Sequence, residues 1–264
     1  MPSNPKKMTA PKLRAMKGGA AKIVCITAYD AVMGALADEA GVDLVLVGDS
    51  MGNVILGMES TIPVTLEQMV HHVTATKAGV KNALLVADLP FGTYQSGISQ
   101  AVNSAVALVK AGAEAVKLEG TYTDEIRAII KAGIPVMGHV GMTPQSLNNF
   151  GGFRVQGKGD HGSEVMEAAK EVVEAGAFSM VLELIPAALS KEITCEVDCP
   201  TIGIGAGVDC DGQVQIFHDM LGLSPFKLKH AKVYCEAGEL MKKAIQEYAG
   251  EVRKAGFPTS EHSV

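Results

Sequence analysis

The hydrophobic and polar positions of this chain repeat one pattern five times: an Ala-Gly pair, a short apolar run, and a polar residue near the end of the run. A glycine at that place suits the left-handed end of a preceding helix. An apolar run of four to eight residues suits a strand that is buried on both faces. The glycines are Gly41, Gly79, Gly112, Gly133 and Gly176. The polar residues that follow are Asp49, Asp88, Glu119, His139 and Glu183.

Read along the whole chain, the apolar runs predict strands that alternate with helices. Strands are predicted at 23–30, 43–47, 83–88, 114–118, 135–139, 179–183 and 200–204, with an eighth somewhere in 213–219. Helices are predicted at 31–40, 65–78, 97–111, 123–132, 163–175 and 186–194, with a C-terminal helical region at 227–255. Such sustained alternation requires parallel strands joined by right-handed crossovers.

A single (β/α)8 TIM barrel over residues 1–264 fits this α/β pattern best, because the length supplies about eight units in one domain. Residues 1–20 are predicted to form a mobile N-terminal arm with a short helix at 12–17. An open doubly wound sheet is the alternative. That fold would need a glycine-rich turn after the first strand, where this chain has Ala28, Tyr29 and Asp30.

Two long loops, at 50–64 and 140–162, follow predicted strands, and the second contains six glycines. Loops of this length in compact domains are usually functional or disordered. Both leave the catalytic face, so a lid that shields the site from water is expected. The run at 203–207, GIGAG, could bind a phosphate or let the backbone pass close to a flat ligand.

Composition narrows the classes of function. The chain has 29 acidic and 23 basic residues, and a formal net charge of −6 argues against nucleic acid as a partner. No apolar stretch is long enough to span a membrane, and the first residues lack the apolar core of a secretory signal. A cytoplasmic location without membrane attachment is expected. The five cysteines fit no zinc-ligand spacing and are interpreted as reduced thiols.

Three carboxylates are predicted to meet at one rim, because the carboxyl ends of parallel strands lie on the same face of a barrel. They are Asp49, Asp88 and Glu119. Carboxylates held together repel unless a cation or protons neutralise them. Oxygen ligands without cysteine or histidine favour Mg²⁺ over Zn²⁺. The alternative is that each acid caps the helix that follows or pairs with a basic neighbour.

Three further residues on the same rim are candidates for chemistry. Lys117 and Glu119 lie two apart on one strand and point to the same side, so Lys117 either binds an anionic substrate group or pairs with Glu119. His139 is either an active-site residue or a structural histidine. Glu183, with apolar neighbours, is a candidate general base, and capping of the following helix is its alternative.

Several stretches taken together closely resemble the ketopantoate hydroxymethyltransferase family. Each is short, but they span most of the chain in order and at family-like spacing. They are TAYD at 27–30, LVGDSMG at 46–52, ADLPF at 87–91, VKLEG at 116–120, GHVGMTPQS at 138–146, FGGFRVQGKG at 150–159 and IGIGAGVDCDGQ at 202–213.

The resemblance implies a barrel of the phosphoenolpyruvate-mutase type, assembled as a homodecamer. It implies transfer of a hydroxymethyl group from 5,10-methylenetetrahydrofolate to α-ketoisovalerate, giving ketopantoate for pantothenate biosynthesis through a Mg²⁺-stabilised enolate, with one Mg²⁺ per subunit. The metal-binding positions of the family fall on Asp49, Asp88 and Glu119. Its ketoacid-binding positions fall on Asp49, Ser50, Asp88 and Lys117. The proton acceptor falls on Glu183, and a further active-site histidine on His139.

Three other functions are compatible with the sequence. A C–C lyase of the same fold would cleave a 2-ketoacid at the same metal site without folate. A Schiff-base aldolase would use Lys117 as its nucleophile. A metal-dependent binding protein would bind ketoacids without exchanging a proton at C3.

Overall fold

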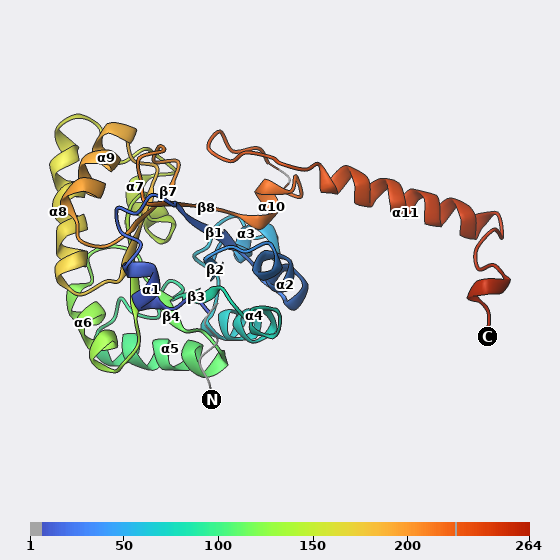
Figure 1. Ribbon diagram of the computed structural model, residues 1–264, viewed down its shortest axis with the longest axis horizontal. Helices are drawn as coiled ribbons and strands as arrows, with labels where there is room; N and C mark the ends of the chain where they lie inside the picture. The colour runs from blue at the N-terminus through green and yellow to red at the C-terminus, as the bar shows by residue number, and fades with distance from the viewer. Residues whose placement is uncertain (1–6, 225) are drawn as a thin grey trace. The chain divides into compact units, whose positions relative to one another are not determined.

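Eight parallel strands close into a barrel in chain order in the computed structural model, which describes residues 7–224 and 226–264 (Figure 1). The strands are β1 (Ile23–Thr27), β2 (Leu44–Val47), β3 (Leu84–Asp88), β4 (Ala115–Lys117), β5 (Val136–Gly141), β6 (Ser179–Glu183), β7 (Thr201–Ile204) and β8 (Gly212–Gln215). The barrel closes where β8 pairs with β1, Ile23 opposite Gly212. The predicted (β/α)8 architecture is confirmed.

Within residues 7–216 the longer helices form a layer outside the strands (Figure 1). They are α2 (Ala31–Glu39), α4 (Leu66–Gly79), α5 (Ile98–Ala111), α6 (Thr123–Lys131), α8 (Gly162–Glu174) and α9 (Ala187–Glu196). Every residue of β2, β3 and β4 is buried. These strands therefore have the two buried faces that their apolar runs predicted, one toward the barrel axis and one toward the helices.

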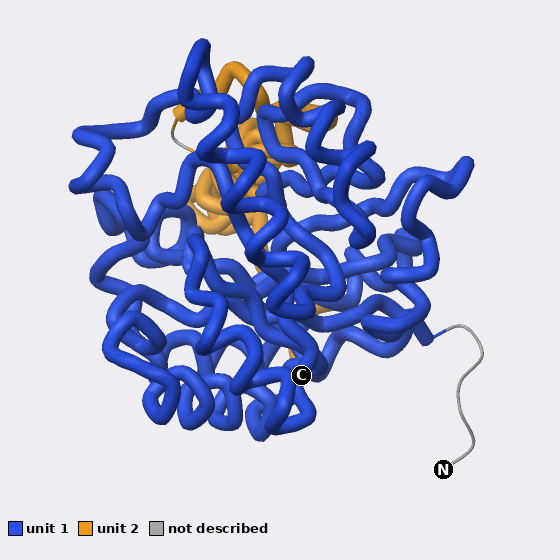
Figure 2. Tube along the Cα trace, turned by 90° about the vertical axis from the view of Figure 1, so that its left-hand side faces the viewer, with its two compact units in different colours: residues 1–216 blue, residues 217–264 orange. Residues whose placement is uncertain are grey.

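The chain divides into two compact units, residues 1–216 and 217–264 (Figure 2). The whole barrel lies in the first unit. The second contains α10 (Phe217–Met220), α11 (Ala237–Arg253) and a 3-10 turn at Ser260–His262. The prediction that a single domain extends over residues 1–264 therefore stays a prediction.

The eighth strand and the C-terminal helix differ from their predicted bounds. The strand ends at Gln215, and α10 begins at Phe217 inside the range that was assigned to the strand. The helix α11 begins ten residues later than 227. In both places the apolar residues are spaced irregularly, so periodicity gave no clear boundary.

The described part of the predicted N-terminal arm contacts the barrel, and residues 1–6 lie outside the described residues. Lys7 Nζ donates to the carbonyl of Ala83 at 2.6 Å and pairs with Glu114 at 2.5 Å. The short helix α1 (Ala10–Arg14) buries Leu13 in one apolar cluster with the first residues of β1 to β4. The helix therefore covers the amino-terminal end of the barrel and leaves the carboxyl end for the loops.

Four of the five glycines in the repeated pattern have the positive φ expected at the end of a helix; Gly79 differs. It is the last residue of α4, where an added Cβ would lie 2.2 Å from the carbonyl oxygen of Ala31 in α2. Gly34 on α2 meets the Thr76 carbonyl in the same way, at 2.8 Å. Gly79 is therefore needed for close packing of α2 on α4 and not for a left-handed turn.

The two long loops contain regular structure. The first includes α3 (Met51–Val54), and the second includes a 3-10 turn at Pro144–Ser146, α7 (Leu147–Phe150) and a 3-10 turn at Gly159–His161. All five cysteines are free thiols, and Cys25, Cys199 and Cys210 are buried. No helix of the described residues is long and apolar enough to cross a membrane.

A substitution at Gly138 in β5 tests the contact between the barrel strands and the helices outside them. A Cβ at this position would lie 2.2 Å from Cγ1 of Val172, a fully buried residue of α8. We expect Gly138→Ala to lower the free energy of unfolding by roughly 1–3 kcal/mol, the usual cost of overpacking a core. Chemical denaturation measures this change.

The background variant Val172→Ala serves as the control, because it removes the atom that the new methyl group would strike. Gly138→Ala should cost clearly less in that background than in the wild type. An equal cost in both backgrounds would show that this contact is not what excludes a side chain at position 138.

Candidate active site

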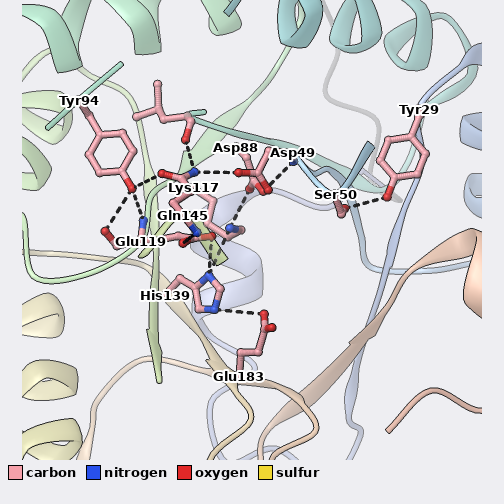
Figure 3. Close-up of polar contacts among 11 residues, drawn as sticks. Tyr29, Asp49, Ser50, Asp88, Tyr94, Lys117, Glu119, His139, Gln145 and Glu183 are labelled. Atoms are coloured by element: carbon pink, nitrogen blue, oxygen red, sulfur yellow. Dashed lines mark hydrogen bonds and ion pairs between the residues drawn. The ribbon is translucent and has the colours of Figure 1, made fainter. Parts of the chain in front are cut away.

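Polar side chains gather at the carboxyl ends of β2 to β6 and form one connected network (Figure 3). Asp49 lies two residues beyond β2, Asp88 ends β3, Lys117 ends β4 with Glu119 two residues further on, His139 lies within β5, and Glu183 ends β6. Parallel pairing in register brings these ends together, as Asp88 opposite Lys117 illustrates. The structure thus brings together all six of these sequence-predicted residues.

Lys117 is buried and pairs with a carboxylate. Its Nζ lies 3.0 Å from Asp88 Oδ1, and both side chains are only 4% exposed. Burial alone would lower the pKa of Lys117, but the carboxylates of Asp88, Glu119 and Asp49 outweigh burial and raise the pKa above its ordinary value. Lys117 is therefore held as a cation, with Asp88 rather than Glu119 as its direct partner.

The three carboxylates do not share the same electrostatic environment. Burial raises the pKa of Asp49 well above its ordinary value, and repulsion from Asp88 and Glu119 raises it further. Burial also raises the pKa of Asp88, although Lys117 opposes the shift. For Glu119 the hydrogen bond and charge of His139 outweigh burial, and the pKa is lowered. The site holds more negative charge than Lys117 compensates.

His139 lies between two glutamates. Its Nδ1 is 3.5 Å from Glu119 Oε1, and its Nε2 is 3.4 Å from Glu183 Oε2. Burial and the charge of Lys117 both lower the pKa of His139, but the neighbouring carboxylates of Glu119 and Glu183 outweigh them and raise the pKa to about 9. A protonated imidazole therefore links the candidate base to the carboxylate cluster.

Gln145 and Tyr94 complete the network, and sequence reasoning did not single them out as site residues. Gln145, in the 3-10 turn after β5, donates from Nε2 to Asp49 Oδ2 at 2.8 Å and from its main-chain N–H to Glu119 Oε2 at 2.9 Å. Tyr94 donates to Gln145 Oε1 at 2.7 Å. Gln145 does lie inside the stretch GHVGMTPQS, and that stretch was the available signal.

Ser50 lies apart from the charged network, at the start of α3 (Figure 3). Its Oγ is 2.8 Å from the hydroxyl of Tyr29, which is fully buried just beyond β1. The carbonyl of Tyr29 is in turn 2.7 Å from His72 Nδ1. Ser50 is half-buried, so its hydroxyl is placed at the rim with its direction set by Tyr29.

The main chain beyond the candidate base has an unusual conformation. Leu184, the residue after Glu183, has φ of 46°, in the left-handed region that few residues other than glycine adopt. Its N–H donates to the carbonyl of Ile204, and its own carbonyl accepts from the N–H of Gln156, both at 2.9 Å. Two neighbouring segments therefore hold the turn that follows Glu183.

Asp49, Asp88 and Glu119 fit a magnesium ion by chemistry and by charge. They offer only oxygen donors, and burial with mutual repulsion raises the pKa of Asp49 and Asp88, as expected where a cation would be stabilising. Within residues 7–224 and 226–264, no three acidic, histidine or cysteine side chains already converge on one coordination point. Asp88 and Glu119 face Lys117 and His139 instead, so these two contacts would have to change for the carboxylates to ligate an ion.

Solved structures of distant sequence share this fold. The structure of 2,3-dimethylmalate lyase, a member of the phosphoenolpyruvate mutase/isocitrate lyase superfamily, matches with a TM-score of 0.60 and 16% identity over 97% of this chain and 91% of that chain. Phosphonopyruvate hydrolase in complex with oxalate and Mg²⁺ matches with a TM-score of 0.62 and 16% identity over 97% and 93%. These similarities confirm the predicted type of barrel.

The family follows from sequence comparison. The model of the family described as ketopantoate hydroxymethyltransferase matches residues 7–260. The 3-methyl-2-oxobutanoate hydroxymethyltransferase of Thermotoga maritima is 50% identical over 260 residues, 97% of this chain and 96% of that protein. The enzyme of the same name from Moorella thermoacetica is 50% identical over 262 residues, 97% of each. The chain belongs to the ketopantoate hydroxymethyltransferase family of enzymes, as its sequence motifs predicted.

The raised pKa of His139 predicts a pH-dependent stability. The folded protein binds this proton more tightly than the unfolded chain, where the pKa is about 6.5. The stabilisation is therefore complete below about pH 6.5 and is lost as the pH rises through about 9. For this fully buried group we expect roughly 2–4 kcal/mol, measured by urea denaturation of the metal-free protein between pH 6 and 10.

His139→Gln is the matched control, because glutamine has no titrating ring. Other groups titrate in both proteins, so the difference between wild type and variant isolates His139. A difference that does not change between pH 6 and 10 would contradict the assigned protonation.

Proposed function

We propose that this protein transfers a hydroxymethyl group from 5,10-methylenetetrahydrofolate to α-ketoisovalerate in the cytoplasm, giving ketopantoate for pantothenate biosynthesis. Besides membership of the family, one feature of the structure supports the proposal: a buried cluster of carboxylates around Lys117 at the carboxyl end of the barrel. A 2-ketoacid is an anion that must lose a proton from C3. A site for this reaction needs positive charge beside the acid and a base beside the carbon.

Asp49, Asp88 and Glu119 would hold one Mg²⁺ per subunit. Bound there, the ion would withdraw electrons from the ketone of the substrate and so make the C3 proton more acidic. A protein of the same fold, phosphonopyruvate hydrolase, has been solved with Mg²⁺ and oxalate, a small dianion with adjacent carboxylates. That complex supports the same kind of ligand for this site.

Asp49, Ser50, Asp88 and Lys117 would bind the ketoacid. Lys117 remains protonated in its ion pair with Asp88, so it supplies positive charge toward the substrate carboxylate or the enolate oxygen. The hydroxyl of Ser50, which can accept from Tyr29, is free to donate to a substrate oxygen. A Schiff-base aldolase would need Lys117 as a neutral amine, and the raised pKa of Lys117 disfavours that chemistry.

Glu183 would remove the C3 proton. It is the most exposed member of the charged network, with a side chain that is 15% exposed against 3% for His139, so a substrate carbon can approach it. His139 Nε2 faces its carboxylate and holds it in place. The resulting enolate would form a C–C bond with the one-carbon unit, while water supplies the hydroxyl group, the bonds from that carbon to the folate nitrogens break, and tetrahydrofolate leaves.

Glu183→Gln tests the assigned base. Glutamine keeps the size and hydrogen bonding of glutamate but cannot accept the proton. We expect both turnover and folate-independent deuterium exchange at C3 of α-ketoisovalerate to fall by roughly 100-fold or more. Nuclear magnetic resonance follows the exchange, and ketopantoate formation measures turnover.

Two controls separate the roles within the site. Glu183→Gln should keep Mg²⁺ binding, whereas Asp49→Asn should lose it together with turnover. Wild-type exchange in Glu183→Gln would point to another base, with His139 as the first candidate. Wild-type turnover of a single organic acid without folate would indicate a lyase of the same fold.

We further propose that the protein is a homodecamer, as the family resemblance implies. Light scattering at micromolar concentration should then give a mass about ten times the 27.5 kDa of one chain. A mass near that of a single chain would contradict this assembly.

A further inference from the structure

We propose that Gln145 is a positioning residue of the candidate metal site, which holds Asp49 and Glu119 in place without neutralising either carboxylate. The proposal rests on the proposed function, because it takes these carboxylates as ligands of the ion. Neither the residue nor this role follows from the strand-end pattern that revealed the other site residues.

Gln145 contacts both carboxylates at once. Its main-chain N–H donates to Glu119 Oε2 at 2.9 Å, and its side-chain Nε2 donates to Asp49 Oδ2 at 2.8 Å. Asp49 follows β2, Glu119 follows β4 and Gln145 follows β5, so a single residue connects three βα loops. The relative position of the two carboxylates therefore depends on the turn at Pro144–Ser146.

The orientation of the side-chain amide is fixed by four partners. Nε2 also donates to the carbonyl of Leu89 at 2.9 Å. Oε1 accepts from the hydroxyl of Tyr94 at 2.7 Å and from Nε2 of Gln95 at 3.1 Å. An amide has two N–H donors and two acceptor lone pairs, so its whole capacity is used. A flipped amide would place Oε1 against the carboxylate of Asp49.

Burial makes these hydrogen bonds of Gln145 hard to replace. Gln145 is 5% exposed and Tyr94 is 1% exposed, so water has little access to replace a lost hydrogen bond. Without the amide, Asp49 would lose the neutral side-chain donor that orients it and could rotate away from its neighbours.

A neutral donor suits this position better than a charged one. Lysine or arginine would pair with Asp49 and compete with a divalent cation for the same oxygens. Glutamine orients the carboxylate and leaves its full charge for the ion. Partners of metal ligands that act in this way typically change metal affinity by 10–100-fold when they are removed.

Gln145→Met tests the proposal, because methionine has a similar length but no hydrogen-bonding amide. We expect the Kd for Mg²⁺ alone, measured by isothermal titration calorimetry, to rise at least tenfold. Turnover at saturating Mg²⁺ should recover in part. Gln100→Met is the matched control: Gln100 also binds a loop carbonyl, that of Gly92, but touches no carboxylate, and its Kd should equal that of the wild type.

The outcomes separate this proposal from the proposed function. A wild-type protein that does not bind Mg²⁺ would overturn the proposed function and this inference with it. A wild type that binds, with Gln145→Met binding equally tightly, would overturn the inference alone. If Gln145→Met does not fold, Gln145→Asn, whose shorter amide cannot reach Asp49, must show the raised Kd. Failure of both to fold would mark Gln145 as structural and contradict the proposal.

Discussion

The cost of burying charge is the constraint on which the carboxyl end of this barrel depends. Lys117 and three acids lie together away from water, and each would be strongly destabilising alone. The ion pair of Lys117 with Asp88 offsets part of that cost, and protonated His139 offsets another part at Glu119. Among the described residues no cationic side chain forms an ion pair with Asp49, which depends on an uncharged amide. The arrangement therefore leaves a deficit of positive charge beside Asp49.

The barrel produces this arrangement because its strands are parallel and short. The amino-terminal ends of β1 to β4 are covered by α1 and an apolar cluster around Leu13, whereas the charged site residues lie at the opposite end. Adjacent strands then place residues far apart in sequence side by side, as with Asp88 and Lys117. The same geometry that builds an apolar core at one end assembles the charged network at the other.

The features that could be predicted from the sequence are those that follow from the periodic spacing of apolar residues. Apolar runs located seven strands, and the polar residues near their ends proved to lie together in one network. Gln145 and Tyr94 could not be found in this way, because they lie in irregular segments whose side-chain directions follow from local turns. The prediction that Gly79 ends a helix in a left-handed turn was wrong for a different reason. The Ala-Gly pattern is the same whether a glycine ends a helix or admits a second helix, and only packing distinguishes the two.

The left-handed turn at Leu184 has a consequence for any attempt to transplant the base. The main-chain carbonyl of Glu183 accepts a hydrogen bond from the N–H of Met142, and the main chain of the next residue bonds to Ile204 on one side and to Gln156 on the other. The part that would have to be transferred is thus the junction of three chain segments and not the strand β6 alone. Grafting that strand into another barrel, with a foreign loop and a foreign seventh strand, would carry over a glutamate but not the backbone that aims it.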